Sequence, residues 1–303
     1  MKSLLFWTSS YAQLGRGIAE SVGADIGDIE SKVFPDGERY LRVLTTVRER
    51  DVILVGGTTD DRATFDLFDI ACAISAYGAR SLKIVIPFFG YSTMERAVRA
   101  GEVVTAKTRA RMLSAIPTAP FGNQIIMLDL HSEGIPFYFE GPVKTRHLYA
   151  KKLIVKKARE LGGASFTLGS VDAGRAKWVE SLANDLGVNA GFVYKRRGDD
   201  GLVSIAGVNV SVKGQNVVIY DDMIRSGGSL LQAAHAYKAA GAEKIWALTT
   251  HGLFTQDALK KLKASGVIES VVSTDSHPAA LSFNDPFLEV VSTAEVFADA
   301  LRT

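Results

Sequence analysis

The chain has 303 residues, of which 35 are Lys or Arg and 33 are Asp or Glu, so its formal net charge is +2. Hydrophobic residues make up 47% of it, a balance typical of globular proteins that bury a large core without disulfides or a structural metal. The length favours two domains, and the lack of a basic tail or stripe in the sequence argues against nucleic-acid binding.

Cysteine content and hydropathy bear on the compartment. The single cysteine, Cys72, cannot form an internal disulfide, which favours a reducing environment. The apolar run near the N-terminus is too short for a secretory signal, and no apolar stretch reaches 18 residues. We therefore expect a cytoplasmic protein without a membrane segment.

Short β-rich runs alternate with helical segments in the first half of the chain. Near-continuous apolar runs at 51–57, 81–88 and 124–130 predict strands that are buried on both faces of a parallel sheet. The periodic segments 61–77 and 105–115 predict crossover helices between them. This alternation is typical of doubly wound α/β architecture.

The second half repeats the plan, with strands and helices in turn. We expect a hairpin or flap at 201–212, because this segment alternates in polarity and ends at a Lys-Gly turn. The expected strands are 165–171, 190–195, 216–222, 244–250 and 270–275, and the expected helices are 174–186, 229–240 and 256–264.

These runs predict two tandem doubly wound α/β domains. The Gly141-Pro142 turn is the best candidate for their boundary, which gives one domain of residues 1–141 and another of residues 142–291. A terminal helix at about 292–303 is expected to pack on the first domain.

The strongest functional signal follows the predicted strand 216–222. Asp221 and Asp222 stand at its carboxyl end, where open α/β sheets bind ligands. Adjacent carboxylates can accept hydrogen bonds from the vicinal hydroxyls of a ribose. In the following loop, residues 225–229, glycines let backbone amides point at one anion beside a helix N-terminus, and serines add hydroxyl donors. The alternative is an ordinary strand–turn–helix connection with Ser229 as the N-cap.

This segment resembles the ribose-phosphate loop of the type I phosphoribosyltransferase fold. Phosphoribosyltransferases and ribose-phosphate pyrophosphokinases share that fold, and the loop by itself does not separate them. The resemblance assigns the sugar phosphate to Asp221, Asp222, Arg225, Ser226, Gly227, Gly228 and Ser229.

Further segments, in the same order as in the family, favour the pyrophosphokinases. Residues 34–43, FPDGERYLRV, resemble the family segment that meets the adenine of ATP across a subunit boundary, which implies a homo-oligomer. Phe34 can stack on a purine, and Asp36 and Glu38 can accept hydrogen bonds from its amino group. A plain hairpin turn at Asp36-Gly37 is the alternative.

Two later segments resemble the rest of the family's ATP site. Residues 87–114 are similar to the segment that lines it, which implies Arg96 and Arg99 as cations against the triphosphate. Residues 128–134, LDLHSEG, resemble the family's Asp-Leu-His-Ala-Glu, which implies that His131 contacts both ATP and magnesium. Solvated arginines and a histidine satisfied within the protein are the alternatives.

Two segments of the second half resemble the family's diphosphate and catalytic loops. Residues 170–178, SVDAGRAKW, imply that Asp172 holds Mg²⁺ and that Ala173 and Gly174 present backbone amides. Residues 194–198, YKRRG, resemble the catalytic flexible loop and imply Lys195 and Arg197 as catalytic residues together with His131. A solvated cluster of cations is the alternative.

The resemblance implies a ribose-phosphate diphosphokinase with Mg²⁺ as its cofactor. Such an enzyme transfers the β,γ-diphosphate of Mg-ATP to the 1-hydroxyl of ribose 5-phosphate and yields 5-phosphoribosyl 1-diphosphate and AMP. A phosphoribosyltransferase and a non-catalytic regulatory homologue remain alternatives. A DNA-binding repressor on the same fold is disfavoured, because the sequence lacks a DNA-reading module and positive charge.

Two departures from the main bacterial class refine the resemblance. Thr93-Met94-Glu95 stands where that class has Arg-Gln-Asp, and Arg225 stands where it has Asp. Residues 87–118 and HGLF at 251–254 look closer to the plant-type second class, which is less strict about its nucleotide donor and lacks phosphate activation and ADP inhibition. Arg225 also raises the hypothesis of an acceptor with a 5-diphosphate, such as ADP-ribose.

Overall fold

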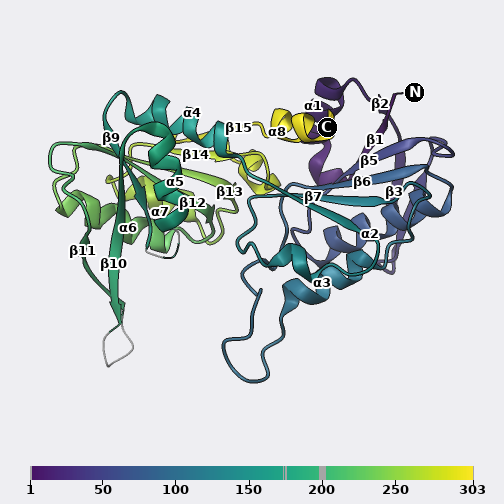
Figure 1. The fold of residues 1–303 in the computed structure, drawn as a ribbon, viewed down its shortest axis with the longest axis horizontal. Coiled ribbons are helices and arrows are strands. Elements are labelled where there is room, and N and C mark those ends of the chain that lie inside the picture. The colour runs from purple at the N-terminus through teal and green to yellow at the C-terminus, as the bar shows by residue number, and fades with distance from the viewer. Residues whose placement is uncertain (1, 173, 175, 198–202, 303) are drawn as a thin grey trace. The chain divides into compact units, whose positions relative to one another are not determined.

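The computed structural model describes residues 2–172, 174, 176–197 and 203–302; of 195–197 and 203–206 it describes the backbone alone. The chain forms two compact units, Met1–Tyr149 with Thr293–Thr303, and Ala150–Ser292 (Figure 1). The division therefore follows Tyr149 and not the Gly141-Pro142 turn. The reason is that strand β8 (Lys144–Leu148) pairs with the preceding strand of the first sheet.

The first unit is built on a six-stranded parallel sheet in the order β2-β1-β5-β6-β7-β8. Across the sheet, successive strands are added on one side from β1 to β2 and on the opposite side from β5 to β8. The strand order therefore reverses between β1 and β5. The other strands are β1 (Leu4–Trp7), β2 (Asp25–Ile26), β5 (Asp51–Val55), β6 (Ser81–Ile86) and β7 (Asn123–Leu128).

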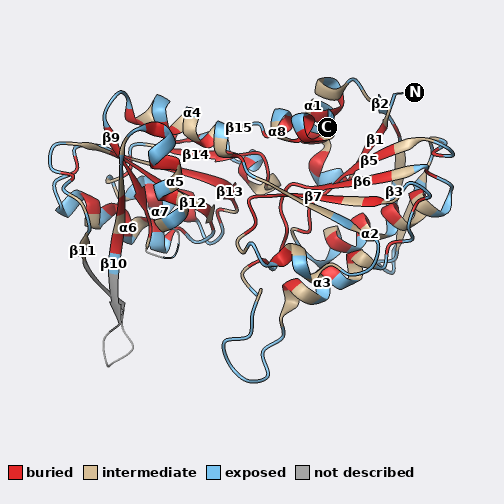
Figure 2. Cartoon of the chain, in the orientation of Figure 1, coloured by how far each residue is buried: buried red, intermediate tan, exposed pale blue. Residues whose placement is uncertain are grey.

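Helices cover both faces of this sheet. In Figure 1, α1 (Ala12–Val22) and α8 (Ala294–Arg302) lie on one face, and α2 (Asp61–Ala76) and α3 (Thr105–Ser114) lie on the other. Strands between two helical layers need apolar side chains on both faces. The apolar runs of β5, β6 and β7 are accordingly almost wholly buried (Figure 2).

The last helix, α8, belongs to the first unit although it ends the chain. It packs against α1, and its carbonyl groups receive hydrogen bonds from cations of the sheet. Lys83 Nζ donates to the carbonyl of Leu301 at 3.3 Å, and Arg146 Nη1 donates to that of Ala300 at 2.8 Å. Cations at a helix C-terminus also interact favourably with its dipole.

An antiparallel hairpin of β3 (Ile29–Val33) and β4 (Arg39–Val43) forms a separate small sheet in the first unit. Its turn holds residues 34–38, in which Gly37 adopts a φ of 93°. The turn carries Phe34, Asp36 and Glu38 on exposed backbone.

The second unit holds a seven-stranded sheet in the order β11-β10-β9-β12-β13-β14-β15, in which every pairing is parallel except that of β10 with β11. Its order reverses between β9 and β12. The strands are β9 (Phe166–Ser170), β10 (Asn189–Arg197), β11 (Val203–Val208), β12 (Asn216–Ile224), β13 (Ile245–Gly252), β14 (Val271–Thr274) and β15 (Leu288–Val291).

The helices of the second unit also pack on the sheet. α4 contacts β9, β12 and β13, α5 contacts β9 and β10, and the two helices contact each other. α6 and α7 contribute to a core over β12–β14. The bounds are α4 (Lys151–Gly162), α5 (Ala176–Leu186), α6 (Gly228–Ala239) and α7 (Ala258–Ala264), and short 3₁₀ helices lie at Ser9–Tyr11, Ile135–Tyr138 and Pro278–Ser282.

The expected α/β fold with parallel sheets in two domains is confirmed. Within the described ranges, no helix combines the length and the apolar character that crossing a bilayer requires. The cytoplasmic location stays a prediction.

Candidate functional site

Two predicted loops meet at the switch point of the second sheet. Strands β9 and β12 are parallel neighbours, with Ser170 opposite Tyr220. The Asp172 segment follows β9, and residues 225–229 follow β12, so both leave the same edge of the sheet. Ligands of open α/β sheets bind at this edge, where the strand order reverses. The geometry therefore brings these two predicted segments together.

Residues 225–229, called here the glycine loop, form the N-terminus of α6. Gly227, with a φ of 76°, is the N-cap, and the helix begins at Gly228. Ser229 therefore lies in the first turn and is not the N-cap. Within the described chain, the hydroxyls of Ser226 and Ser229 make no hydrogen bond, and Arg225 is exposed without an ion pair. The loop thus offers amide, hydroxyl and guanidinium donors to an anion.

The two aspartates differ in their exposure. Strand β12 continues to Ile224, and consecutive side chains of a strand point to opposite faces. Asp221 is half-buried and accepts a hydrogen bond from the backbone amide of Asp222 at 3.0 Å, whereas Asp222 is only 4% exposed. Asp221 is thus the more accessible of the pair, and their shared role stays a prediction.

The Asp172 segment is fixed by local hydrogen bonds. Asp172 Oδ1 accepts from the amide of Gly174 at 2.8 Å, and its carbonyl accepts from Ser170 Oγ at 2.8 Å. Behind it, the buried Tyr237 donates its hydroxyl to the carbonyl of Ser170 at 3.1 Å. Burial raises the pKa of Tyr237 far above its usual value, so this phenol remains a donor. Ala173 lies outside the described residues.

The predicted catalytic cations follow on the neighbouring strand. Lys195 and Arg197 lie on β10, which pairs with β11 and has a register shift between Tyr194 and Lys195. Their side chains lie outside the described part of the structure. The backbone places both residues in a hairpin that extends from the same sheet as Asp172 and the glycine loop (Figure 1).

In the first unit, Arg96 and Arg99 lie in a long exposed segment between β6 and α3 (Figure 2). The Glu102 carboxylate accepts from the amides of Val98 and Arg99 at 2.7 and 3.1 Å. These two backbone hydrogen bonds lower the pKa of Glu102. Tyr138 donates its hydroxyl to the carbonyl of Glu95. The segment is therefore anchored at defined points.

Sequence reasoning missed a cluster at the base of this segment. Tyr91, whose φ is 60°, donates its hydroxyl to Asp61 Oδ1 at 2.9 Å. Arg109 pairs with the same carboxylate, and its guanidinium lies 5.1 Å from the centre of the Tyr91 ring. The three residues are far apart in sequence and carry no motif, so only the fold could reveal them.

His131 lies in the segment that follows β7, and Arg96 and Arg99 lie in the segment that follows β6. Because β6 and β7 are parallel neighbours, the two segments leave the same edge of the sheet. His131 is half-buried. The turn begins at Asp129, a buried non-glycine residue with a left-handed φ of 38°. Such a conformation costs on the order of 1–3 kcal/mol and persists only where the surroundings impose it.

His147 and Tyr149 support this turn, and sequence reasoning missed both. The amide of the buried Leu130 donates to His147 Nε2 at 2.9 Å. The His147 and Tyr149 rings lie 4.3 Å apart, and the Tyr149 hydroxyl donates to Glu133 Oε1 at 3.2 Å. Burial and the Glu133 carboxylate raise the pKa of Tyr149. Nothing in the polar run 144–149 signals this role.

The predicted adenine contacts lie on the exposed turn of the β3–β4 hairpin. Phe34 is 46% exposed, and its ring meets Tyr40 edge-on at 6.3 Å. The Asp36 carboxylate accepts the amide of Glu38 at 3.0 Å, as in a hairpin turn. Residues 34–38 thus form the hairpin turn that was the alternative interpretation, and this turn also carries the exposed Phe34 ring. The adenine role of these residues stays a prediction.

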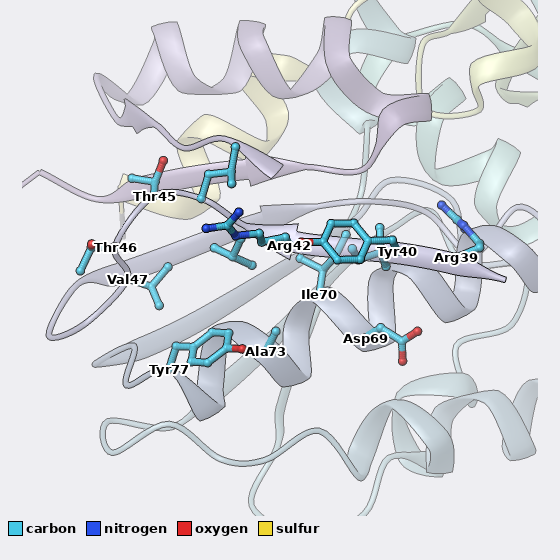
Figure 3. Close-up of a pocket in the computed structure, with 13 residues that line it drawn as sticks. Arg39, Tyr40, Arg42, Thr45, Thr46, Val47, Asp69, Ile70, Ala73 and Tyr77 are labelled. Atoms are coloured by element: carbon cyan, nitrogen blue, oxygen red, sulfur yellow. The ribbon is translucent and has the colours of Figure 1, made fainter. Parts of the chain in front are cut away.

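A cavity of about 780 Å³ lies between β4 and α2 (Figure 3). Tyr40 and Arg42 line one side, and Asp69, Ala73 and Tyr77 line the other. Phe34, Asp36 and Glu38 do not line it, but residues 39–43 of the same predicted segment do, and Tyr40 also contacts the Phe34 ring.

Among the described residues, no cluster of three or more His, Cys, Asp or Glu side chains could hold a metal ion. Mg²⁺ usually keeps several waters and takes only one or two protein carboxylates along with substrate phosphates. The Asp172 carboxylate fits that pattern. The imidazole of His131 fits it less well, because Mg²⁺ prefers oxygen ligands.

Known proteins are similar to nearly the full length of this chain. The family model of the N-terminal domain of ribose phosphate pyrophosphokinase matches residues 3–116, and that of the phosphoribosyl synthetase-associated domain matches residues 203–303. A ribose-phosphate pyrophosphokinase of a Marinomonas species is 30% identical over 308 residues, covering 99% of this chain and 95% of the relative. That of Fusobacterium nucleatum is 29% identical over 301 residues, covering 98% and 93%.

A solved structure agrees with these relatives. The crystal structure of phosphoribosylpyrophosphate synthetase from Mycobacterium smegmatis superimposes with a TM-score of 0.87 at 26% identity and covers 99% of this chain and 98% of its own. The similarity therefore extends through both units and is not confined to one domain.

The support of the His131 turn by His147 is testable. Replacement His147→Leu removes the acceptor of the buried Leu130 amide, so we expect the free energy of unfolding to fall by about 1–3 kcal/mol. Urea unfolding followed by circular dichroism measures this loss. The exposed His235 on α6 provides a matched control, and His235→Leu should change stability by less than about 0.5 kcal/mol. Equal effects of the two variants would contradict the assignment.

Proposed function

Because this chain belongs to the ribose-phosphate pyrophosphokinase family, we propose that it transfers the β,γ-diphosphate of ATP to the 1-hydroxyl of ribose 5-phosphate. The products are 5-phosphoribosyl 1-diphosphate and AMP. One observation of the structure carries the proposal: the Asp172 segment and the glycine loop flank the switch point of the second sheet. They combine carboxylates for a sugar with donors for a phosphate.

We assign the sugar phosphate to the glycine loop and the two aspartates. The free donors of Ser226, Gly227, Gly228 and Ser229 suit a phosphate at the positive end of α6. Asp221 can accept hydrogen bonds from the pentose hydroxyls, and its exposure makes it the stronger contributor of the pair.

ATP is assigned to the loops of the first unit. Arg96 and Arg99 are exposed on the segment that precedes α3 and supply positive charge for the triphosphate. His131 follows the adjacent strand, β7. The adenine contacts fall to Phe34, Asp36 and Glu38 at the tip of the hairpin. Because this tip is exposed, we propose a homo-oligomer in which it completes a neighbour's nucleotide site.

Diphosphate transfer needs alignment and neutralisation of charge more than covalent chemistry. The sugar hydroxyl attacks the β-phosphorus in line, its bond to that phosphorus forms as the bond to the α-phosphate oxygen breaks, and AMP departs. Lys195 and Arg197 neutralise the charge that develops on the β-phosphate and on the leaving oxygen. No general base is assigned.

We propose Mg²⁺ as the cofactor, which Asp172, directly or through water, and His131 would hold together with the triphosphate. When bound, the ion neutralises phosphate charge and helps to align the diphosphate. Asp172 is oriented for such a contact by the amide of Gly174. Ala173 and Gly174 belong to the same loop and are assigned to the diphosphate.

The finer assignment to the plant-type second class rests on residues 87–118 and on HGLF at 251–254. It implies a wider choice of nucleotide donor and independence of phosphate activation. Arg225 is exposed and adds a cation to the glycine loop, which suits the phosphate of ribose 5-phosphate without requiring a larger acceptor. Neither ADP-ribose as acceptor nor a regulatory homologue without activity is favoured by the relatives, which bear the name ribose-phosphate pyrophosphokinase.

A product assay tests the proposed reaction. The purified protein is incubated with ATP, Mg²⁺ and ribose 5-phosphate, and the nucleotides are separated by chromatography and identified by mass spectrometry. We expect equal amounts of AMP and 5-phosphoribosyl 1-diphosphate, because the β-phosphorus is attacked. ADP as the product would indicate γ-phosphate transfer, and either that result or the absence of turnover would refute the proposal.

A second prediction concerns Lys195. If it stabilises the charge of the transition state, Lys195→Ala should lower kcat at least about 100-fold and leave nucleotide affinity nearly unchanged. Steady-state kinetics and calorimetric titration with ATP measure the two quantities. Lys152→Ala, at an exposed position on α4, is the matched control and should keep full activity. A small change in kcat would remove Lys195 from this role.

A further inference from the structure

An unusual backbone segment lies directly beside the glycine loop. Residues 253–257, called here the brace, connect β13 to α7. Three of these five residues are non-glycine residues with left-handed φ: Phe254 at 47°, Gln256 at 55° and Asp257 at 57°. Left-handed backbone is disfavoured for residues with a Cβ atom, so the surrounding structure must impose this conformation.

The brace is hydrogen-bonded to the glycine loop where the loop begins. The amides of Leu253 and Phe254 donate to the carbonyl of Ile224 at 2.9 and 3.1 Å, and the amide of Thr255 donates to that of Arg225 at 3.0 Å. These bonds continue the pairing of β12 with β13 past the end of the ladder, where Ile224 lies opposite Gly252. The brace thus fixes the backbone that enters the glycine loop.

Packing holds the brace and the loop together. Phe254 is 4% exposed, and its ring meets Phe283 edge-on at 5.7 Å. A Cβ atom at Gly252 would come within 2.4 Å of the Phe254 ring, so this ring occupies the space that a side chain would need. Just after the brace, Leu262 of α7 would lie 3.3 Å from a Cβ atom at Gly227.

The turn shape of the brace determines where its amides point. Asp257, the N-cap of α7, and Gln256 reverse the chain after Thr255, whose carbonyl accepts the amide of Ala258 at 3.1 Å. Gln256 is exposed, so its side chain is not needed for the core, whereas its backbone conformation is. A change of this conformation would therefore act on Thr255 and, through it, on Arg225.

We propose that the brace positions the glycine loop for the phosphate of the sugar substrate. Its residues are positioning residues, since the proposal gives them no contact with substrate. The inference rests on the proposed function, because it assumes that the glycine loop receives the 5-phosphate. Holding phosphate donors in place before binding avoids an ordering cost at the moment of binding.

The test places the same strain at two exposed sites. A β-branched residue is poorly suited to left-handed φ, so Gln256→Val should distort the brace. Glu49 is also exposed and has a φ of 60°, but it belongs to the first unit, whereas the brace belongs to the second. Glu49→Val is therefore the matched control. Gln256→Gly keeps the left-handed turn without strain and is the rescue variant.

We expect Gln256→Val to raise the KM for ribose 5-phosphate at least about 5-fold and to change the KM for ATP less than about 2-fold. Glu49→Val should leave both constants unchanged while lowering the melting temperature to a similar extent, and Gln256→Gly should restore the KM for ribose 5-phosphate. An unchanged KM for ribose 5-phosphate in Gln256→Val, or equal rises for both substrates, would overturn the proposal. If Gln256→Val does not fold, the exposed Asp257→Val, with a φ of 57°, takes its place with the same expectations.

Binding of ribose 5-phosphate to the unmodified protein is measured in parallel by calorimetry. Absence of binding there refutes the proposed function itself, and the inference about the brace with it. Binding to the unmodified protein, with equal affinity for Gln256→Val, refutes the brace alone.

Discussion

Parallel pairing of the strands is the constraint on which the remaining structure depends. It gathers the carboxyl ends of β6 and β7 at one edge of the first sheet, and those of β9, β12 and β13 at one edge of the second. At each of these ends the chain passes from the buried, apolar sheet to the solvent-exposed edge. Polar groups can therefore gather at the edge without being buried in a core. Arg96, Arg99, His131, the Asp172 segment and the glycine loop lie in the segments that follow these ends, whereas the proposed adenine contacts lie on the turn of the β3–β4 hairpin.

Backbone strain follows the same distribution. Of the six described non-glycine residues with left-handed φ, only Glu49 lies elsewhere; Tyr91, Asp129, Phe254, Gln256 and Asp257 all follow carboxyl ends of strands. Strained conformations persist where packing and hydrogen bonds over-determine them, and they concentrate at functional sites. The hydrogen bond from Leu130 to His147 and those from residues 253–255 to Ile224 and Arg225 are such restraints.

The sequence predicted the central strands better than the edges. Strands β5, β6 and β7 are covered on both faces, so their apolar runs predict them directly. The edge strand β8 has the sequence KTRHL with half-buried or exposed side chains and gives no such signal. For this reason the predicted domain boundary lies eight residues before the observed one.

The glycine loop was found from its composition, yet its N-cap is Gly227 because the loop needs a left-handed residue there. The supports contributed by His147, Asp61 and the brace depend on contacts between distant segments, which no local pattern encodes.

The central claim is that the glycine loop and the two aspartates bind a phosphorylated pentose. A crystal structure of the protein with ribose 5-phosphate tests it most directly. The account predicts phosphate oxygens within hydrogen-bond distance, about 3.2 Å or less, of the backbone nitrogens at Gly227, Gly228 and Ser229, with the sugar hydroxyls toward Asp221. A phosphate bound at another part of the chain, or a sugar turned away from both carboxylates, would contradict it.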